Sequence, residues 1–251
     1  MTDLDNINLK VALIDSDYYT EKAIHAYLAW DRRTRALTDY SSLEDFWQSL
    51  GGSAPAAYPD VIILDVNNVG ERGDLRRSIR RLVDTVDGAT LVCLSHVDDL
   101  DLFYAAAEGG ARAFLHKEDV RFHVASAVCI AATELRPDEL LYSHNMDEAR
   151  RMLNHRRLGK DYAVRLPSPR QYPGLTPRVR RTIELFAIEG MPSALIANEL
   201  GIKLGSVTDN IKRAYDALGL HDLEPDETFL ASLPQRERAF MKLTALEEPR
   251  R

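Results

Sequence analysis

The most constraining feature of the sequence is a short apolar run, Val61 to Leu64, which follows Pro59 and is closed by Asp65. An uninterrupted apolar run of this length predicts a strand buried on both faces, as in a parallel sheet. Asp65 would then lie at the carboxyl end of the strand. In open α/β sheets, ligands and chemistry gather at that end of the strands. Asp65 is therefore the first candidate for a functional residue.

Further apolar strands and amphipathic helices alternate along the first half of the chain. The predicted strands are Leu9–Ile14, Thr90–Leu94 and Ala113–Leu115, and the predicted helices are Tyr19–Trp30, Leu43–Leu50, Leu75–Val83 and Leu102–Glu108. This alternation predicts an α/β fold, a doubly wound parallel sheet with helices on both faces.

Polar residues follow each predicted strand at the same edge of the sheet. Asp15 and Asp17 follow the first strand, and Ser95 and Lys117 follow later ones, so all of them should lie near Asp65. Clustered carboxylates bind a hard divalent cation such as Mg²⁺ through oxygen ligands. A lysine and a hydroxyl beside them can contact phosphoryl oxygens. Together these residues predict a site for phosphate on an aspartate.

The charge of the chain is unevenly distributed. Residues 1–134 hold 13 Lys and Arg against 22 Asp and Glu, whereas residues 150–220 hold 13 against 6. An acidic half joined to a basic half is typical of a sensing domain coupled to a nucleic-acid-binding domain. No apolar run approaches the roughly 18 residues that a membrane-spanning helix needs, and the N-terminus is acidic, unlike a signal peptide. We therefore expect a cytoplasmic protein without membrane contact.

The second half begins with an expected linker, residues 135–174, which contains a basic helix at Asp147–Leu158 and a Pro-rich connector at Pro167–Pro173. A small helical domain is predicted over residues 175–220. Thr176 and Pro177 mark its first helix, and the Gly201 turn separates the second helix from the third. Helix, turn and helix in this order predict a helix-turn-helix domain. Residues 221–251 form an extension with one more predicted helix, which carries Phe240 and Leu243.

Residues 8–134 resemble the CheY-like receiver domain of response regulators, which has a flavodoxin-like fold. The motifs that carry the resemblance are "IDSD", "VIILD", "LVCLS" and "AFLHK", each at a predicted strand end. The resemblance implies that Asp65 is the phosphoacceptor, Ser95 the switch hydroxyl, Lys117 the phosphate-binding lysine and Phe114 the aromatic switch residue. It also implies a Mg²⁺ site whose ligands are Asp15, Asp17, Asp65 and Asn67.

Two positions depart from the receiver pattern. Receivers usually have two adjacent acids after the first strand, and here Ser16 follows Asp15, so the next acid is displaced to Asp17. The loop after Asp65 is "VNNVG", which lacks the usual Met-Pro-Gly pattern. We therefore expect Mg²⁺ to bind weakly and phosphorylation to be weak or absent.

Residues 175–220 resemble the LuxR/NarL-type DNA-binding domain. The matching strings are "LTPR", "IANELGI", "SVTDNI" and "LGL". The resemblance implies that residues Gly205–Arg213, in the third helix predicted at about Gly205–Leu218, lie towards the major groove of duplex DNA. Its candidate DNA-binding residues are Lys203, Ser206, Thr208, Asp209, Lys212 and Arg213. Asp209 departs from the neutral or basic residue that the family often has there.

The sequence therefore predicts a transcriptional response regulator, not an enzyme, in which a receiver controls DNA binding. Its expected partners are duplex DNA, a second copy of the chain, a sensor histidine kinase and RNA polymerase. One alternative is a protein-interaction adaptor that has lost DNA readout. The other is a haloacid-dehalogenase-like phosphatase, in which Asp15 is the nucleophile and Asp17 the general acid, with Ser95, Lys117 and the Asp98-Asp99 pair in later roles.

Overall fold

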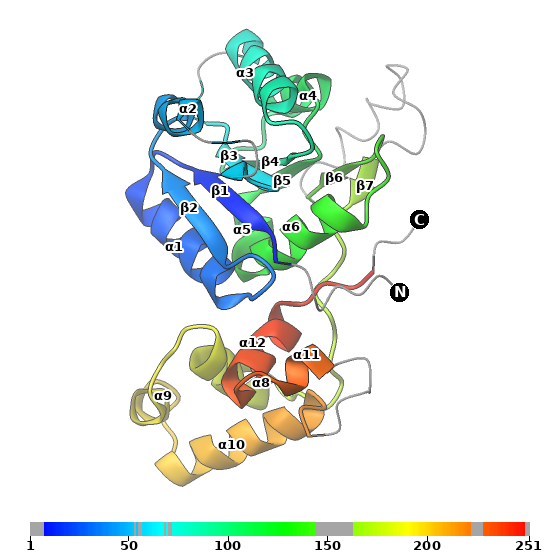
Figure 1. The fold of residues 1–251 in the computed structure, drawn as a ribbon. Helices are drawn as coiled ribbons and strands as arrows, with labels where there is room; N and C mark the ends of the chain where they lie inside the picture. Colours follow the sequence, from blue (N-terminus) through cyan, green and yellow to red (C-terminus); the bar gives the residue numbers. More distant parts are fainter. Residues whose placement is uncertain are drawn as a thin grey trace. The chain divides into compact units, whose positions relative to one another are not determined.

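The chain forms two compact units in the computed structural model (Figure 1), one built mainly from residues 8–167 and the other from residues 168–247. The structure describes residues 8–52, 54, 57–67, 69, 72–143, 163–221 and 228–248. None of the helices in this part of the chain is long and apolar enough to span a membrane.

The first unit is organised around one sheet with the strand order β2-β1-β3-β4-β5-β6-β7. The strands are β1 Lys10–Ile14, β2 Ala36–Tyr40, β3 Val61–Asp65, β4 Thr90–Ser95, β5 Ala113–His116, β6 Leu140–Tyr142 and β7 Ala163–Arg165. All neighbouring strands pair in parallel. Every residue of β3 is buried, as the uninterrupted apolar run predicts.

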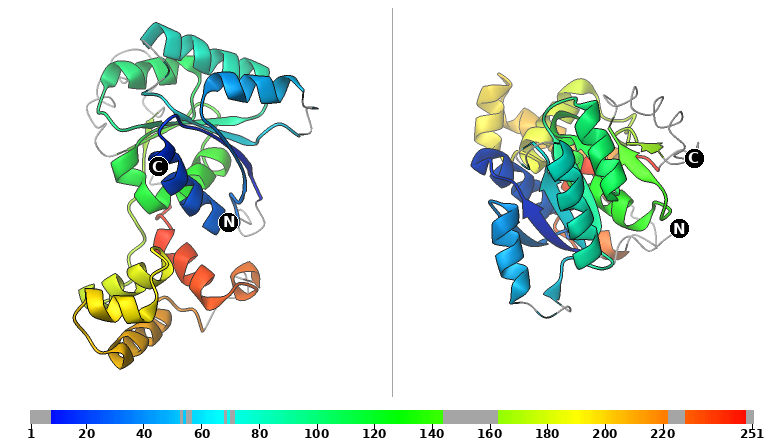
Figure 2. Two further views of the ribbon diagram at one scale, coloured as in Figure 1. Left: turned by 90° about the vertical axis from the view of Figure 1, so that its left-hand side faces the viewer. Right: turned by 90° about the horizontal axis from the view of Figure 1, so that it is seen from above.

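Helices cover both faces of this sheet (Figures 1 and 2), which confirms the predicted doubly wound fold. One face carries α2 Leu43–Gly51, α3 Arg72–Thr85 and α4 Leu100–Gly109; the other carries α1 Tyr18–Trp30, α5 Lys117–Val120, the 3-10 helix η3 Arg121–His123 and α6 Val124–Thr133. Helices α3 and α4 approach closely at Gly109, where a Cβ atom would lie 2.5 Å from Cγ2 of Ile79. Glycine is therefore required at that crossing.

Three strands were not predicted by the sequence pattern. Strand β2 lies at the edge of the sheet, and Thr38 and Asp39 interrupt its apolar character. Strands β6 and β7 have three residues each, too few to give a periodic pattern. Both strands fall within the stretch expected to be a linker, and the first unit extends to Pro167. The predicted basic helix at Asp147–Leu158 lies outside the described residues.

The second unit is helical over its described residues. Its helices are α8 Pro177–Ala187, α9 Ser193–Glu199, α10 Leu204–Ala217, α11 Thr228–Ala231 and α12 Gln235–Thr244. The predicted cap of α8 is present, because Oγ1 of Thr176 accepts a hydrogen bond from N of Val179. Gly201, with φ 60°, turns the chain between α9 and α10.

The predicted helix in the C-terminal extension is present as α12 and contributes to the core of the second unit. Ala239 and Leu243 of α12 join a buried cluster with Leu175, Val179 and Ile183. These three residues belong to the start of the helix-turn-helix domain. A helix near the C-terminus of the chain therefore stabilises the first helix of that domain.

Candidate functional site

The predicted polar strand ends meet at the point where the strand order of the sheet reverses. Strand β1 lies between β2 and β3, and the chain then continues outward through β4 and β5. Asp15 follows β1, Asp65 ends β3, and Lys117 follows β5. This is the position at which open α/β sheets bind their ligands. Asp15 and Asp65 are 2% and 5% exposed, so both carboxylates lie inside the protein.

Lys117 holds the two buried carboxylates together. Its Nζ lies 2.9 Å from Oδ2 of Asp15 and 3.3 Å from Oδ2 of Asp65. Burial raises the pKa of Asp15, and the neighbouring negative charge of Asp65 raises it further. Hydrogen bonds from Lys117 and from N of Asp17 act in the opposite direction but do not cancel the effect of burial. We call Asp15, Asp65 and Lys117 the acidic cluster.

Ser95 is linked to the acidic cluster through Asn67. N of Asn67 donates to Oδ1 of Asp65 at 3.1 Å, and Nδ2 of Asn67 donates to Oγ of Ser95 at 3.3 Å. The Ser95 hydroxyl itself donates to O of Val97 at 2.8 Å, and His96 N donates to Oδ1 of Asn67 at 2.9 Å. The hydroxyl of Ser95 is therefore oriented by the loop that follows β4. Asn67, which bonds to both Ser95 and Asp65, connects that hydroxyl to the Asp65 carboxylate.

Phe114 lies in the apolar interior of the first unit. It is 1% exposed, and its ring makes an edge contact with Phe103 of α4 at a centroid distance of 5.5 Å. Its role as a switch residue stays a prediction.

The described residues do not fit the predicted Mg²⁺ site. Oδ1 of Asp17 caps α1 by accepting a hydrogen bond from N of Thr20, which lowers the pKa of Asp17, and the side chain is exposed. Within the described ranges there is no group of three or more acidic, His or Cys side chains that could hold a metal ion. Two carboxylates remain, and the ammonium of Lys117 already contacts both of them and balances one of their two negative charges. Mg²⁺ prefers near-octahedral oxygen coordination, so this pair alone is a poor site.

The same geometry disfavours the phosphatase alternative. That mechanism needs Asp15 as a nucleophile and Asp17 as an adjacent general acid. Instead, Asp15 is bound to Lys117, and Asp17 serves as a helix cap. Asp99 is also occupied as a cap, because its Oδ1 accepts hydrogen bonds from the first turn of α4.

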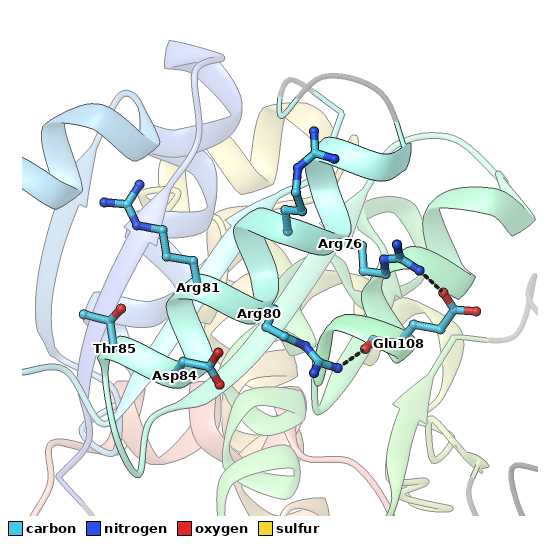
Figure 3. Close-up of a pocket in the computed structure, with 7 residues that line it drawn as sticks. Arg76, Arg80, Arg81, Asp84, Thr85 and Glu108 are labelled. Carbon is cyan, nitrogen blue, oxygen red and sulfur yellow. Dashed lines mark hydrogen bonds and ion pairs between the residues drawn. The ribbon is translucent and has the colours of Figure 1, made fainter.

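A second charged feature of the first unit is a row of arginines on α3 (Figure 3). It borders a surface hollow of about 890 Å³, lined by Arg76, Arg77, Arg80, Arg81, Asp84, Thr85 and Glu108. Nη1 of Arg76 lies 3.2 Å from Oε2 of Glu108, and Nη2 of Arg80 donates to O of Glu108 at 3.0 Å. Arg81 stacks over Trp47 at 4.4 Å. These contacts tie α3 to α4 and α2, so we assign Arg76, Arg80 and Arg81 to the packing of these helices, whereas Arg77 pairs with Asp74 of its own helix.

The second unit presents an exposed polar face on α10. Val207 and Ala214 are fully buried, whereas all six candidate residues are exposed: Lys203, Ser206, Thr208, Asp209, Lys212 and Arg213. Val207 packs with Leu185 of α8 and Ile196 of α9. Asn210 is also buried, and its Nδ2 donates to Oγ1 of Thr182 at 3.2 Å. We call the six exposed residues the α10 face.

Arg178 is a further candidate that the sequence analysis did not identify. A polar hollow of about 280 Å³ at the α10 face is lined by Arg178, Ile202, Ser206, Asp209, Asn210 and Arg213. Arg178 belongs to α8, so its approach to Arg213 depends on how the helices pack. The only signal in the sequence is its place two residues after Thr176, the cap of α8, where a basic residue has no helix-dipole advantage.

The first unit is a doubly wound parallel α/β domain, and the second is a helical domain in which a turn at Gly201 joins α9 to α10. No protein-family model and no curated protein matches the sequence. Among solved structures, the chain is similar to RcsB dimers bound to two parallel DNAs, with 16% identity over 90% of this chain and 100% of that chain and a TM-score of 0.43. It is also similar to RcsB from Salmonella enterica serovar Typhimurium bound to promoter P1flhDC, with 17% identity over 91% and 98% of the two chains and a TM-score of 0.44.

A third similar structure is the response regulator ChrA of a heme-sensing two-component system. Its identity is 19% over 89% of this chain and 95% of that chain, and its TM-score is 0.39.

Proposed function

We propose that this protein is a transcriptional regulator in which a receiver-type unit controls DNA binding by a helix-turn-helix unit. The observation that carries the proposal is the α10 face. It combines exposed cations and hydroxyl groups on one side of a helix whose other side is fixed by a buried core. A helix supported in this way fits the major groove and offers its side chains to base edges.

Within this proposal, the residues of the α10 face have two roles. Lys203, Lys212 and Arg213 neutralise phosphates, with Arg178 as an additional cation at the same hollow. Thr208 and Asp209 contact base edges, where the Asp209 carboxylate accepts a hydrogen bond from the amino group of cytosine. The active species is a homodimer, because two half-sites gain affinity by effective concentration. RNA polymerase is the proposed downstream partner.

In the receiver-type unit, Asp65 is the proposed phosphoacceptor, and a sensor histidine kinase is the proposed donor. An Oδ of Asp65 attacks the phosphorus, and the bond to the leaving group of the donor breaks. Lys117 and Ser95 are the residues that would contact the phosphoryl oxygens. Because the carboxylate pair is a poor Mg²⁺ site, we propose that labelling is slow and that DNA binding does not require it. Asp65→Asn should abolish labelling by a small acyl phosphate.

The full-length protein with mixed-sequence duplex DNA tests the function. Fluorescence anisotropy should give an affinity whose logarithm falls linearly with the logarithm of salt concentration, with a slope of about 0.9 per phosphate contacted. Sequence selection from the same pool should then yield a preferred site. Affinity that is absent at low salt, or unchanged between low and moderate salt, would refute DNA binding.

One observation favours the adaptor as a second candidate. Leu195 of α9 and Leu204 of α10 are 54% and 55% exposed, and exposed apolar side chains are suited to contact with a protein partner. Two exposed leucines together with the carboxylate of Asp209 would be suited to binding a partner protein. The DNA titration separates the two, because an adaptor would show no salt-dependent affinity for duplex DNA.

A further inference from the structure

The first unit contains a cavity that neither the acidic cluster nor the fold explains. It has a volume of about 320 Å³ and opens between α1 and the segment formed by α5 and η3. Its lining residues are Tyr19, Thr20, Ala23, Ile24, Tyr27, Leu94, Lys117, Val120, Arg121 and Val124. This size falls at the small end of the range for cavities that bind small molecules.

The lining of the cavity is apolar with a cationic side. Leu94, Val120 and Val124 are at most 2% exposed and form buried walls. Arg121 supplies positive charge at the rim, whereas the ammonium of Lys117 is already paired with Asp15 and Asp65. None of the lining residues, all within the described part of the chain, is acidic. A small number of polar groups on an apolar wall is the usual pattern of a specific ligand site.

The backbone at Arg121 is strained. Its φ is 39° and its ψ is −123°, a conformation that glycine adopts easily and that costs energy for a residue with a Cβ. Residues held in such conformations concentrate at functional sites. Here the strained residue is an arginine at the rim of the cavity. Its Nε donates a hydrogen bond to O of Glu118 at 2.9 Å.

We propose that this cavity binds a small amphipathic anion, a molecule with an apolar ring or chain and one anionic group. The apolar body lies against Leu94, Val120 and Val124, and the anionic group pairs with Arg121. A neutral apolar molecule would leave the cation unused, and a polyanion would bury charge against apolar walls.

The cavity shares Lys117 with the acidic cluster. The side chain lines the cavity, while its Nζ binds Asp15 and Asp65. A ligand in the cavity therefore adjoins the residue that holds the two carboxylates together. The binding step itself concerns the first unit alone and does not depend on DNA binding, so each can fail without the other.

Fluorescence titration of the full chain with anilinonaphthalene sulfonate tests the proposal, because this probe is an apolar ring system with one anionic group. N-phenylnaphthylamine, which has a similar ring system without the sulfonate, is the matched probe. Saturable binding of the sulfonate to the native protein is expected. Ala23→Phe places a ring at the mouth of the cavity and should weaken binding by roughly tenfold. The control is Ala26→Phe, at an exposed position of the same helix that does not line the cavity, and it should change nothing.

Arg121→Gly tests the anionic part separately, since glycine relieves the backbone strain and cannot weaken the fold through it. The variant should keep its thermal stability, bind the sulfonate about two- to fivefold more weakly, as expected for the loss of one exposed ion pair, and bind the neutral probe unchanged. Arg121→Lys should restore sulfonate binding in part. No saturable binding, equal effects of the two phenylalanine variants, or equal effects of Arg121→Gly on both probes would each overturn the proposal.

Discussion

The acidic cluster and the α10 face differ in where their charges are compensated. In the acidic cluster, two carboxylates at most 5% exposed share one ammonium inside the protein, which balances one of their two charges. On the α10 face, the cations are exposed to solvent, where water and salt screen them. A change in the cluster therefore alters the stability of the first unit, whereas a change on the face alters binding to a charged partner.

This difference also determines how each region responds to conditions. Buried charges interact at low effective dielectric and depend on protonation, so pH should affect the cluster most. Exposed cations bind phosphates by releasing counterions, so salt should affect the face most.

The largest effect is expected in the core that supports the α10 face. Leu243 of α12 is 5% exposed and packs on the start of the helix-turn-helix domain. Leu243→Ala should lower the free energy of unfolding of the second unit by about 2–5 kcal/mol, since a buried leucine leaves a cavity behind. Chemical denaturation measures this loss. The control is Leu195→Ala, at an exposed position, and a similar loss there would contradict the packing described.

Lys117→Met should have the next largest effect, of about 3 kcal/mol at neutral pH, because it leaves two buried carboxylates without their cation. The loss should shrink in acid. Burial raises the pKa of Asp15, so protonation begins above its usual range and removes the repulsion with Asp65 as pH falls. Denaturation of the wild type and the variant across this pH window measures the difference. A difference independent of pH would show that Lys117 does not compensate these carboxylates.

The sequence predicts the α10 face more completely than it predicts the acidic cluster. Val207 and the exposed positions around it follow directly from helical periodicity, so the α10 face could be derived almost completely. The strand ends placed Asp15, Asp65 and Lys117 together, but not their pairing, because Lys117 is 102 residues from Asp15 along the chain.

The remaining features depend on tertiary packing. Asp17 was predicted as a metal ligand, yet its carboxylate caps α1, a local interaction that competes for the same oxygen atoms. Arg178 could not be found, because the packing of α8 against α10 brings it to the hollow. Strands β6 and β7 are too short to give a pattern, and the sheet determines their conformation.

On the α10 face, the double substitution Lys212→Ala with Arg213→Ala should reduce affinity for all DNA sequences alike. Each lost phosphate contact should lower the salt slope by about 0.9, so the wild type and the variant should converge at high salt. The unfolding free energy should not change, since both side chains are exposed. Anisotropy titrations at several salt concentrations measure the slope. A variant that loses affinity for one sequence only would indicate that these residues read bases.

The smallest effect is expected from Ser16→Asp, which adds a third carboxylate beside the acidic cluster. Ser16 is exposed, so the new charge is screened, and Mg²⁺ affinity should rise by about fivefold, the effect of one exposed ion pair. Calorimetric titration with Mg²⁺ measures the gain. The same substitution combined with Asp65→Asn is the control, because a metal held jointly by the new carboxylate and Asp65 loses that gain when Asp65 is neutralised. An equal gain in both backgrounds would place the cation elsewhere, and the acidic cluster would then be a structural ion pair that differs from the α10 face in having no partner to bind.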